Sequence, residues 1–241
     1  MEPYWFLLFF MVSFLYAGIG HGGASGYIAV MTLIGLTPLD IRTNALMLNI
    51  VVASVAFLNF NRKIKLNLDL LIPLFLGSIP LAFIGGSIQI SSTVFKWVLA
   101  IILLVPIVRF LKGEKKQVNQ IKPASFWTLL LTGAAIGFIS GLIGIGGGII
   151  LTPVLLWFSW ATITQAATLS ALFIVANSIS GLSGLWSVEV YIAESFLSIL
   201  GVTLMGGFLG SYFGANRFNE PLLKRILATV LIIAVIKLIW T

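Results

Sequence analysis

The chain has 241 residues, of which 59% are hydrophobic and only 9% are charged, whereas an ordinary soluble domain carries roughly 25% charged residues. No charge occurs between Glu2 and Asp40 or between Lys122 and Glu189, and about 20 apolar residues are enough to span a bilayer. This composition excludes a soluble domain and predicts an all-α integral membrane protein.

The net charge of +7 and the absence of cysteine narrow the function classes. The basic residues lie in short runs between apolar segments, where membrane proteins carry them on cytoplasmic loops. The charge therefore indicates topology, and we expect no nucleic-acid partner. A chain without cysteine has no disulfide and no thiolate metal site, and we expect neither a metal nor a cofactor.

Apolar runs divide the chain into two sets of five segments, at 4–17, 27–36, 44–60, 70–88 and 95–111, then at 126–142, 149–160, 166–185, 191–213 and 222–240. The basic stretch LKGEKKQVNQIK separates the sets. We therefore expect a first repeat (1–111), a cytoplasmic basic linker (112–124) and a second repeat (125–241). In each set glycines interrupt the first two segments, which predicts a broken helical hairpin followed by three spanning helices, about eight to ten membrane segments in all.

The distribution of basic residues predicts the orientation of the two sets. The basic loops at 62–65, 112–122 and 217–225 should be cytoplasmic, which places both termini outside the cell (plasma or inner) membrane. The first set then begins outside and the second begins inside, so the two halves form an inverted-topology repeat. Many secondary transporters have this architecture, with interrupted helices around a substrate site near the midplane.

The glycine-rich stretches GIGHGGA (18–24) and LIGIGGG (142–148) occur once in each half. One alignment, with a spacing of 124 residues, pairs Gly20 with Gly144 and Gly23 with Gly147; a shift of two residues matches GIG with GIG equally well. Broken backbone cannot face lipid, and the helix that follows each break presents free N–H groups that favour anions. Close helix packing is the alternative use of such glycines.

Polar residues of the apolar segments complete the candidate site. His21 is the only histidine, and an ionisable group inside a membrane segment is a functional candidate. It is a candidate for anion contact or proton coupling, or else a neutral hydrogen-bonding group of the break. The other polar side chains either line the site or bond to neighbouring helices. The full set of substrate-binding candidates is Gly20, His21, Gly22, Gly23, Ser25, Asn44, Asn49, Gly144, Gly146, Gly147, Gly148, Thr168, Ser170 and Asn177. Asp40 and Arg42 are expected to form a structural pair at the membrane boundary.

The sequence resembles the sulfite exporter TauE/SafE family. The resemblance rests on GIGHGGASGYIAVMTLIGLTPLDIRTNALMLNIVVASVAF in the first half, and on GFISGLIGIGGGIILTPVLLWF and ATLSALFIVANSISGL in the second. The first copy departs from the common pattern, with His21 inside the glycine run and Ala29 where the second copy has Pro153. The resemblance implies transport of a small sulfur-containing anion, such as sulfite or an organosulfonate, driven by an ion gradient. His21 makes H⁺ the candidate coupling ion.

Features of the sequence also fit functions other than a secondary transporter. An anion channel of the same architecture fits the same sequence features. An intramembrane serine protease would use Ser25 and His21. In such proteases the base comes from a different helix and lies within hydrogen-bonding distance of the serine. Here both residues lie in one glycine-rich break. A nucleotide-binding loop would need a preceding β-strand. We therefore expect a transporter and not an enzyme.

Overall fold

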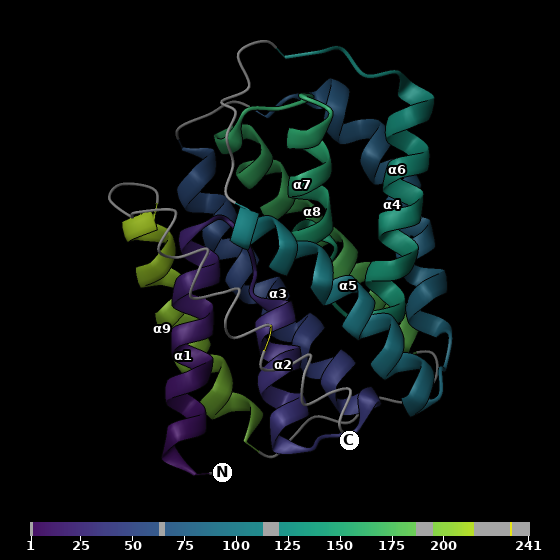
Figure 1. Ribbon diagram of the computed structural model, residues 1–241. Helices are drawn as coiled ribbons and strands as arrows, with labels where there is room; N and C mark the ends of the chain where they lie inside the picture. The colour runs from purple at the N-terminus through teal and green to yellow at the C-terminus, as the bar shows by residue number, and fades with distance from the viewer. Residues whose placement is uncertain (1, 63–65, 113–120, 187–194, 215–231, 233–241) are drawn as a thin grey trace.

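The computed structural model describes residues 2–62, 66–112, 121–186, 195–214 and 232, and the structural statements below concern this part of the chain. It contains nine α-helices and no β-strand there (Figure 1). The helices are α1 (Pro3–Gly18), α2 (Ala24–Ile34), α3 (Pro38–Asn61), α4 (Leu68–Ser87), α5 (Ser92–Lys112), α6 (Phe126–Ile143), α7 (Gly148–Trp157), α8 (Ile163–Trp186) and α9 (Phe196–Gly214). They coincide with the first nine predicted segments, while the tenth, 222–240, lies outside the described residues apart from position 232.

Several helices begin at sequence signals for an N-terminus. The Thr37 side chain accepts a hydrogen bond from the Asp40 amide, just before Pro38 opens α3. Ser125 caps α6 in the same way through the amide of Thr128. Such caps satisfy amides that have no partner within the helix, and proline is favoured at the first helical position. The ends of the long helices are thus fixed locally.

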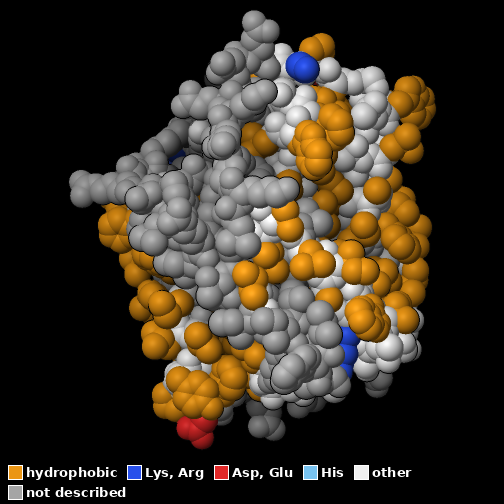
Figure 2. All heavy atoms as spheres, viewed as in Figure 1, with side chains coloured by type: hydrophobic (Ala, Val, Ile, Leu, Met, Phe, Trp, Pro, Cys, Tyr) orange, Lys and Arg blue, Asp and Glu red, His pale blue; other side chains and the backbone are white. Residues whose placement is uncertain are grey.

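Five helices are long and apolar enough to cross a membrane: Pro38–Asn61, Leu68–Ser87, Phe126–Ile143, Thr164–Trp186 and Phe196–Gly214. Four shorter apolar helices, Pro3–Gly18, Ala24–Ile34, Ser92–Ile102 and Gly148–Trp157, accompany them within the described residues. Hydrophobic side chains cover much of the visible surface (Figure 2), and Trp127 and Leu131 on α6 are more than half exposed. An exterior of this kind suits a lipid environment, so the chain is an integral membrane protein.

Helices α4 and α6 pack with their backbones in close contact and run in the same direction. A Cβ at Gly77 would overlap the Leu130 carbonyl, and one at Gly85 would overlap the Phe138 carbonyl. Small residues allow this approach and are a common basis of helix packing in membranes. The most extensive contacts of the molecule join these two helices.

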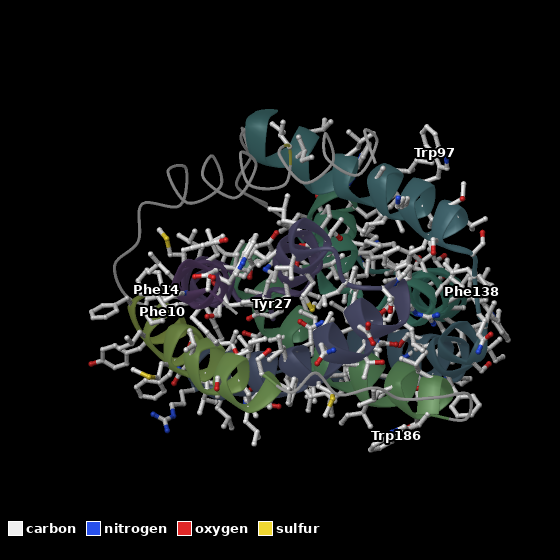
Figure 3. The ribbon with its side chains drawn as sticks, turned by 90° about the horizontal axis from the view of Figure 1, so that it is seen from below. Phe10, Phe14, Tyr27, Trp97, Phe138 and Trp186 are labelled. Carbon is white, nitrogen blue, oxygen red and sulfur yellow. The ribbon has the colours of Figure 1, made fainter. Side chains whose placement is uncertain are left out.

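Helices α1 and α9 form a second parallel pair of the same kind at the opposite edge of the molecule (Figure 1). A Cβ at Gly206 would lie close to the Phe10 carbonyl, and one at Gly214 would overlap the backbone of Gly18. Viewed from below, Phe10 and Phe14 lie at this edge, whereas Tyr27 of α2 lies in the interior (Figure 3). The long helices α3 and α8 pack on each other between the two pairs, and the short helices α2 and α7 lie against them.

Candidate functional site

The first glycine break connects α1 to α2 and reverses the chain. Its turn is closed by the His21 amide, which donates to the Tyr16 carbonyl at 2.9 Å. Gly20 and Gly23 have φ of 78° and 97°, a left-handed conformation that glycine adopts without steric cost. The chain then doubles back, so that the Tyr27 ring packs 6.1 Å from the Phe9 ring, centroid to centroid. The break and α2 form a buried helical hairpin with α1.

The second break connects α6 to α7 with the same backbone pattern. The Ile145 amide donates to the Ser140 carbonyl at 3.3 Å, and Gly144 and Gly147 have φ of 85° and 79°. Gly147 precedes α7 in the left-handed conformation, as Gly23 precedes α2. Residues from 144 to 148 are all buried.

The equivalent features of the two breaks are 124 residues apart. His21 and Ile145 donate the closing bonds to Tyr16 and Ser140 respectively, and each of these pairs differs by 124 in number. The glycines before α2 and α7, at positions 23 and 147, differ by the same amount. The backbone therefore favours this register over the alternative that is shifted by two residues.

The Asn49 side chain, on α3, lies between the two breaks. A Cβ on Gly22 would lie 2.6 Å from Asn49 Oδ1, and a Cβ on Gly146 would lie 2.7 Å from Asn49 Nδ2. A side chain at either glycine would therefore force Asn49 to move. Asn49 is fully buried, and neither of its polar atoms has a hydrogen-bond partner among the described residues. The structure thus brings three of the predicted residues, Gly22, Asn49 and Gly146, together at one point.

Each break also packs against the long helix of the other set. A Cβ on Gly20 would lie 2.7 Å from Ala167 Cβ on α8, and one on Gly144 would lie 2.9 Å from Arg42 Cα on α3. Gly148, at the start of α7, lies next to the Ser170 carbonyl of α8. The glycines are therefore required for close backbone approach as well as for the turns.

His21 connects the first break to the second half through a chain of hydrogen bonds. Its Nδ1 lies 3.0 Å from the Ile19 carbonyl oxygen, and its Nε2 lies 3.0 Å from Thr152 Oγ1 on α7. Thr152 Oγ1 in turn lies 2.7 Å from Ser170 Oγ on α8. His21 is only 6% exposed. The imidazole therefore belongs to a buried network that includes residues of both halves.

Ser25, in the first turn of α2, donates to the Tyr16 hydroxyl at 2.8 Å. This bond ties α2 to α1 beside the first break. In the described structure the Ser25 hydroxyl thus uses its hydrogen on a phenol of α1, while the His21 ring is directed to Thr152. That arrangement differs from the nucleophile-to-base bond that a serine protease needs.

Three other predicted residues bond to their own helices. Asn44 Nδ2 donates to the Asp40 carbonyl, Thr168 Oγ1 to the Thr164 carbonyl and Asn177 Nδ2 to the Phe173 carbonyl. The Oδ1 atoms of Asn44 and Asn177 remain buried without a partner among the described residues, as do the hydroxyls of Ser140 and Ser178. A buried polar group without a partner costs about 1–3 kcal/mol, so a polar partner that reached any of these atoms would recover part of that cost.

The expected pair of Asp40 and Arg42 is wrong. Asp40 accepts a bond from Thr37 at 2.7 Å at the exposed start of α3. Arg42 is 3% exposed and donates to carbonyls at the ends of two helices: Gly85, Gly86 and Ile88 at the end of α4, and Gly141 near the end of α6. The last carbonyls of a helix have no partner within it and carry partial negative charge, so they accept hydrogen bonds from the buried guanidinium.

Two helix N-termini supply the electrostatics of the site. The first amides of α2 and α7 have no intrahelical acceptor, and the positive end of each helix dipole favours anions. Neither α2 nor α7 contains an acidic residue. Among the described residues no group of three or more His, Asp or Glu could hold a metal ion. The two helix ends therefore present partial positive charge with no acidic side chain on either helix.

Thr152 was missed by the sequence reasoning. It is the only polar side chain in the described α7, and that isolation in an apolar helix was the available signal. Ser140 and Tyr16, which close the two breaks through their carbonyls, were missed as well. Their role depends on backbone geometry that side-chain type does not indicate.

A hydrophobic exterior, buried polar residues and paired helix breaks are features that membrane transport proteins share. The chain belongs to the sulfite exporter TauE/SafE family, whose model matches residues 5–238. It is 31% identical to a probable membrane transporter protein, y4hK, of Sinorhizobium fredii, over 97% of this chain and 96% of the relative. It is 26% identical to a probable membrane transporter protein, YdhB, of Bacillus subtilis, over 88% and 89% respectively. No solved structure matches the chain.

Proposed function

We propose that the protein is a secondary transporter that moves a small sulfur-containing anion, of the sulfite or organosulfonate class, by alternating access. The observation that carries the proposal is the position of Asn49. One buried side chain with two unpartnered polar atoms touches both glycine breaks. Each break ends at a helix N-terminus, which favours negative charge.

The substrate class follows the family description, which names sulfite. The site offers uncharged donors and two helix dipoles, and the described parts of α2, α7 and α8 add no basic side chain. Such a site suits a small oxyanion with little net charge better than a polyanion, which would require cationic side chains for compensation.

The proposed architecture is an inverted repeat with eight to ten membrane segments, divided as 1–111, 112–124 and 125–241. Helices α1 to α4 have 16, 11, 24 and 20 residues, and α6 to α9 have 18, 10, 24 and 19. In Figure 1, α1 begins at the bottom of the molecule and α6 at the top. These matched lengths and opposite directions support the repeat. The proposed setting is the cell inner membrane, with both termini outside.

The test is transport by purified protein in proteoliposomes. Radiolabelled sulfite should enter with saturable kinetics, and an excess of unlabelled methanesulfonate should inhibit entry. Asn49→Leu keeps the size of the side chain but removes its polar atoms. We expect it to lower anion affinity about tenfold or more, because a hydrogen bond to a charged group contributes about 1.5–3 kcal/mol.

Asn59→Leu is the matched control. Asn59 lies on the same helix but bonds to Ser211 of α9, away from the breaks. Equal transport by both leucine variants would contradict the assigned site. Current that rises without saturation would instead identify an anion channel, and an absence of sulfite movement with uptake of another anion would overturn the substrate class.

A further inference from the structure

When the His21 ring is neutral, its two hydrogen bonds determine which atom donates and which accepts in each bond of the network. A carbonyl oxygen only accepts, so the bond to Ile19 places the hydrogen on Nδ1. In a neutral imidazole Nε2 is then an acceptor, and Thr152 donates to it. Having used its hydrogen, Thr152 accepts from Ser170. The chain therefore runs from Ser170 through Thr152 to His21.

Thr152 can serve the protonated ring as well. When Nε2 gains a proton it donates, and the Thr152 oxygen accepts while its hydroxyl hydrogen turns toward Ser170. A hydroxyl can both donate and accept, so the 3.0 Å contact between His21 and Thr152 suits both protonation states. An apolar side chain of the same shape would remove the bond in both states, and the loss would be larger for the protonated ring, because hydrogen bonds to charged groups are stronger.

The charge of His21 depends on what occupies the two helix ends. His21 lies two residues before Gly23, which precedes α2, and its ring contacts α7 one turn after that helix begins. An imidazolium at two positive helix ends is disfavoured. An anion bound at the same ends removes that repulsion and adds attraction, so it favours the protonated ring.

The other titratable or charged groups on α1, α2, α3, α7 and α8 either form hydrogen bonds or lie among apolar side chains. On α1 and α2 they are Tyr4, Tyr16 and Tyr27, of which Tyr16 accepts from Ser25. On α3, Asp40 bonds to Thr37 and Arg42 to helix-end carbonyls. Helices α7 and α8 contain no charged or titratable residue. Beside these five helices, the charge that comes and goes during the proposed transport is therefore that of the anion.

We propose that anion binding at the helix ends and proton binding at His21 are coupled one to one, with Thr152 and Ser170 as positioning residues. The inference rests on the proposed function and names its coupling ion as H⁺. Coupling is reciprocal, so the proton also tightens anion binding. As the pH rises, the affinity for the anion should fall about tenfold per pH unit. This holds in the pH range where His21 is neutral in the free protein and protonated in the anion-bound protein.

The test counts the protons taken up with each bound anion. Purified protein is titrated with methanesulfonate in buffers of different ionisation enthalpy at about pH 7.5, where a free imidazole is mostly neutral. Methanesulfonate is fully ionised, so it contributes no proton of its own. The wild type should take up close to one proton per anion. His21→Gln should bind the anion without proton uptake.

Thr152→Val tests the positioning role and should lower proton uptake at the same pH. Thr203→Val is its matched control, because Thr203 is a fully buried threonine of α9 that bonds to its own helix; it should behave as the wild type. If His21→Gln does not fold, two other measurements test the inference. They are the difference in proton uptake between Thr152→Val and Thr203→Val, and the pH dependence of anion affinity in the wild type.

Two results would overturn the inference: anion binding to the wild type without proton uptake, or unchanged uptake in His21→Gln or Thr152→Val. Sulfite serves as a second probe, because its own protonation cancels in the difference between the wild type and His21→Gln. Failure to bind either anion would contradict the proposed function itself, which keeps the two failures distinct.

Discussion

The two glycine breaks share a backbone and differ in chemistry. In both, an amide donates to the carbonyl five residues earlier in the chain, and both place a left-handed glycine before a short helix. The first carries His21 where the second carries Ile145. Helix geometry is therefore duplicated, whereas the ionisable group is present once. In the proposed mechanism the common backbone holds an anion from two sides, and only the side with His21 binds a proton.

The largest expected effect concerns the support beneath the second break. Arg42→Met removes the donors to carbonyls of two helix ends, and we expect a loss of about 3 kcal/mol or more in stability. Thermal unfolding in detergent measures it. Arg42→Lys should recover only part, since one ammonium cannot reach both helices. The equivalent position in the second set, 124 residues later, is Ala166, so only the first set has an arginine there. An Ala166 variant with an equal loss of stability would contradict this difference between the sets.

The glycines before α2 and α7 should be equally sensitive if the breaks are equivalent. Gly23→Val and Gly147→Val each force a β-branched residue into a left-handed conformation, and the new Cβ would lie 2.7 Å from the Tyr27 ring or 2.9 Å from the Phe173 ring. We expect each to lower stability by about 2 kcal/mol. A fall in melting temperature for one variant only would show that the breaks are not equivalent.

Ser25 tests a bond found only in the first break. Ser25→Ala removes its bond to the Tyr16 hydroxyl, for an expected loss of about 1 kcal/mol, and sulfite transport should persist. Tyr16→Phe removes the other partner and should show a similar shift in melting temperature. Loss of proteolysis of a membrane substrate in Ser25→Ala would instead support the protease alternative.

The smallest effect is a control for replacing glycine in general. Gly201 lies within α9, and nothing lies within 4 Å of a Cβ built there. Gly201→Ala should leave transport unchanged and alter stability by at most about 1 kcal/mol, in the favourable direction. A large loss of stability here would mean that the effects at Gly23 and Gly147 do not report on the breaks.

The helices themselves could be predicted from the sequence. Apolar runs such as 44–60 and 166–185 lie within α3 and α8, because the bilayer sets the length of a spanning helix. The glycine stretches were found for a similar reason, since glycine-rich sequence marks broken helix. The register remained open until the left-handed glycines and the closing bonds of His21 and Ile145 were known.

The contacts of the site could not be predicted. In α3 the apolar residues and polar residues such as Asn49 are spread around the helix, so no periodic pattern shows which face is inward. Asn49 could therefore be chosen as a candidate, but not placed between Gly22 and Gly146. Arg42 was assigned to its neighbour Asp40, whereas its partners lie 43 to 99 residues away. Long-range packing decided both.

The glycine contacts of α4 with α6 and of α1 with α9 join helices of the two proposed repeats. In each pair, backbone carbonyls of one helix lie directly against the glycines of the other. Because this contact leaves no space between the helices, each pair should move as one body during transport. The moving parts are then expected to cut across the duplication, with α3 and α8 between them. A cysteine crosslink within either pair should spare transport, whereas one between α3 and α8 should stop it.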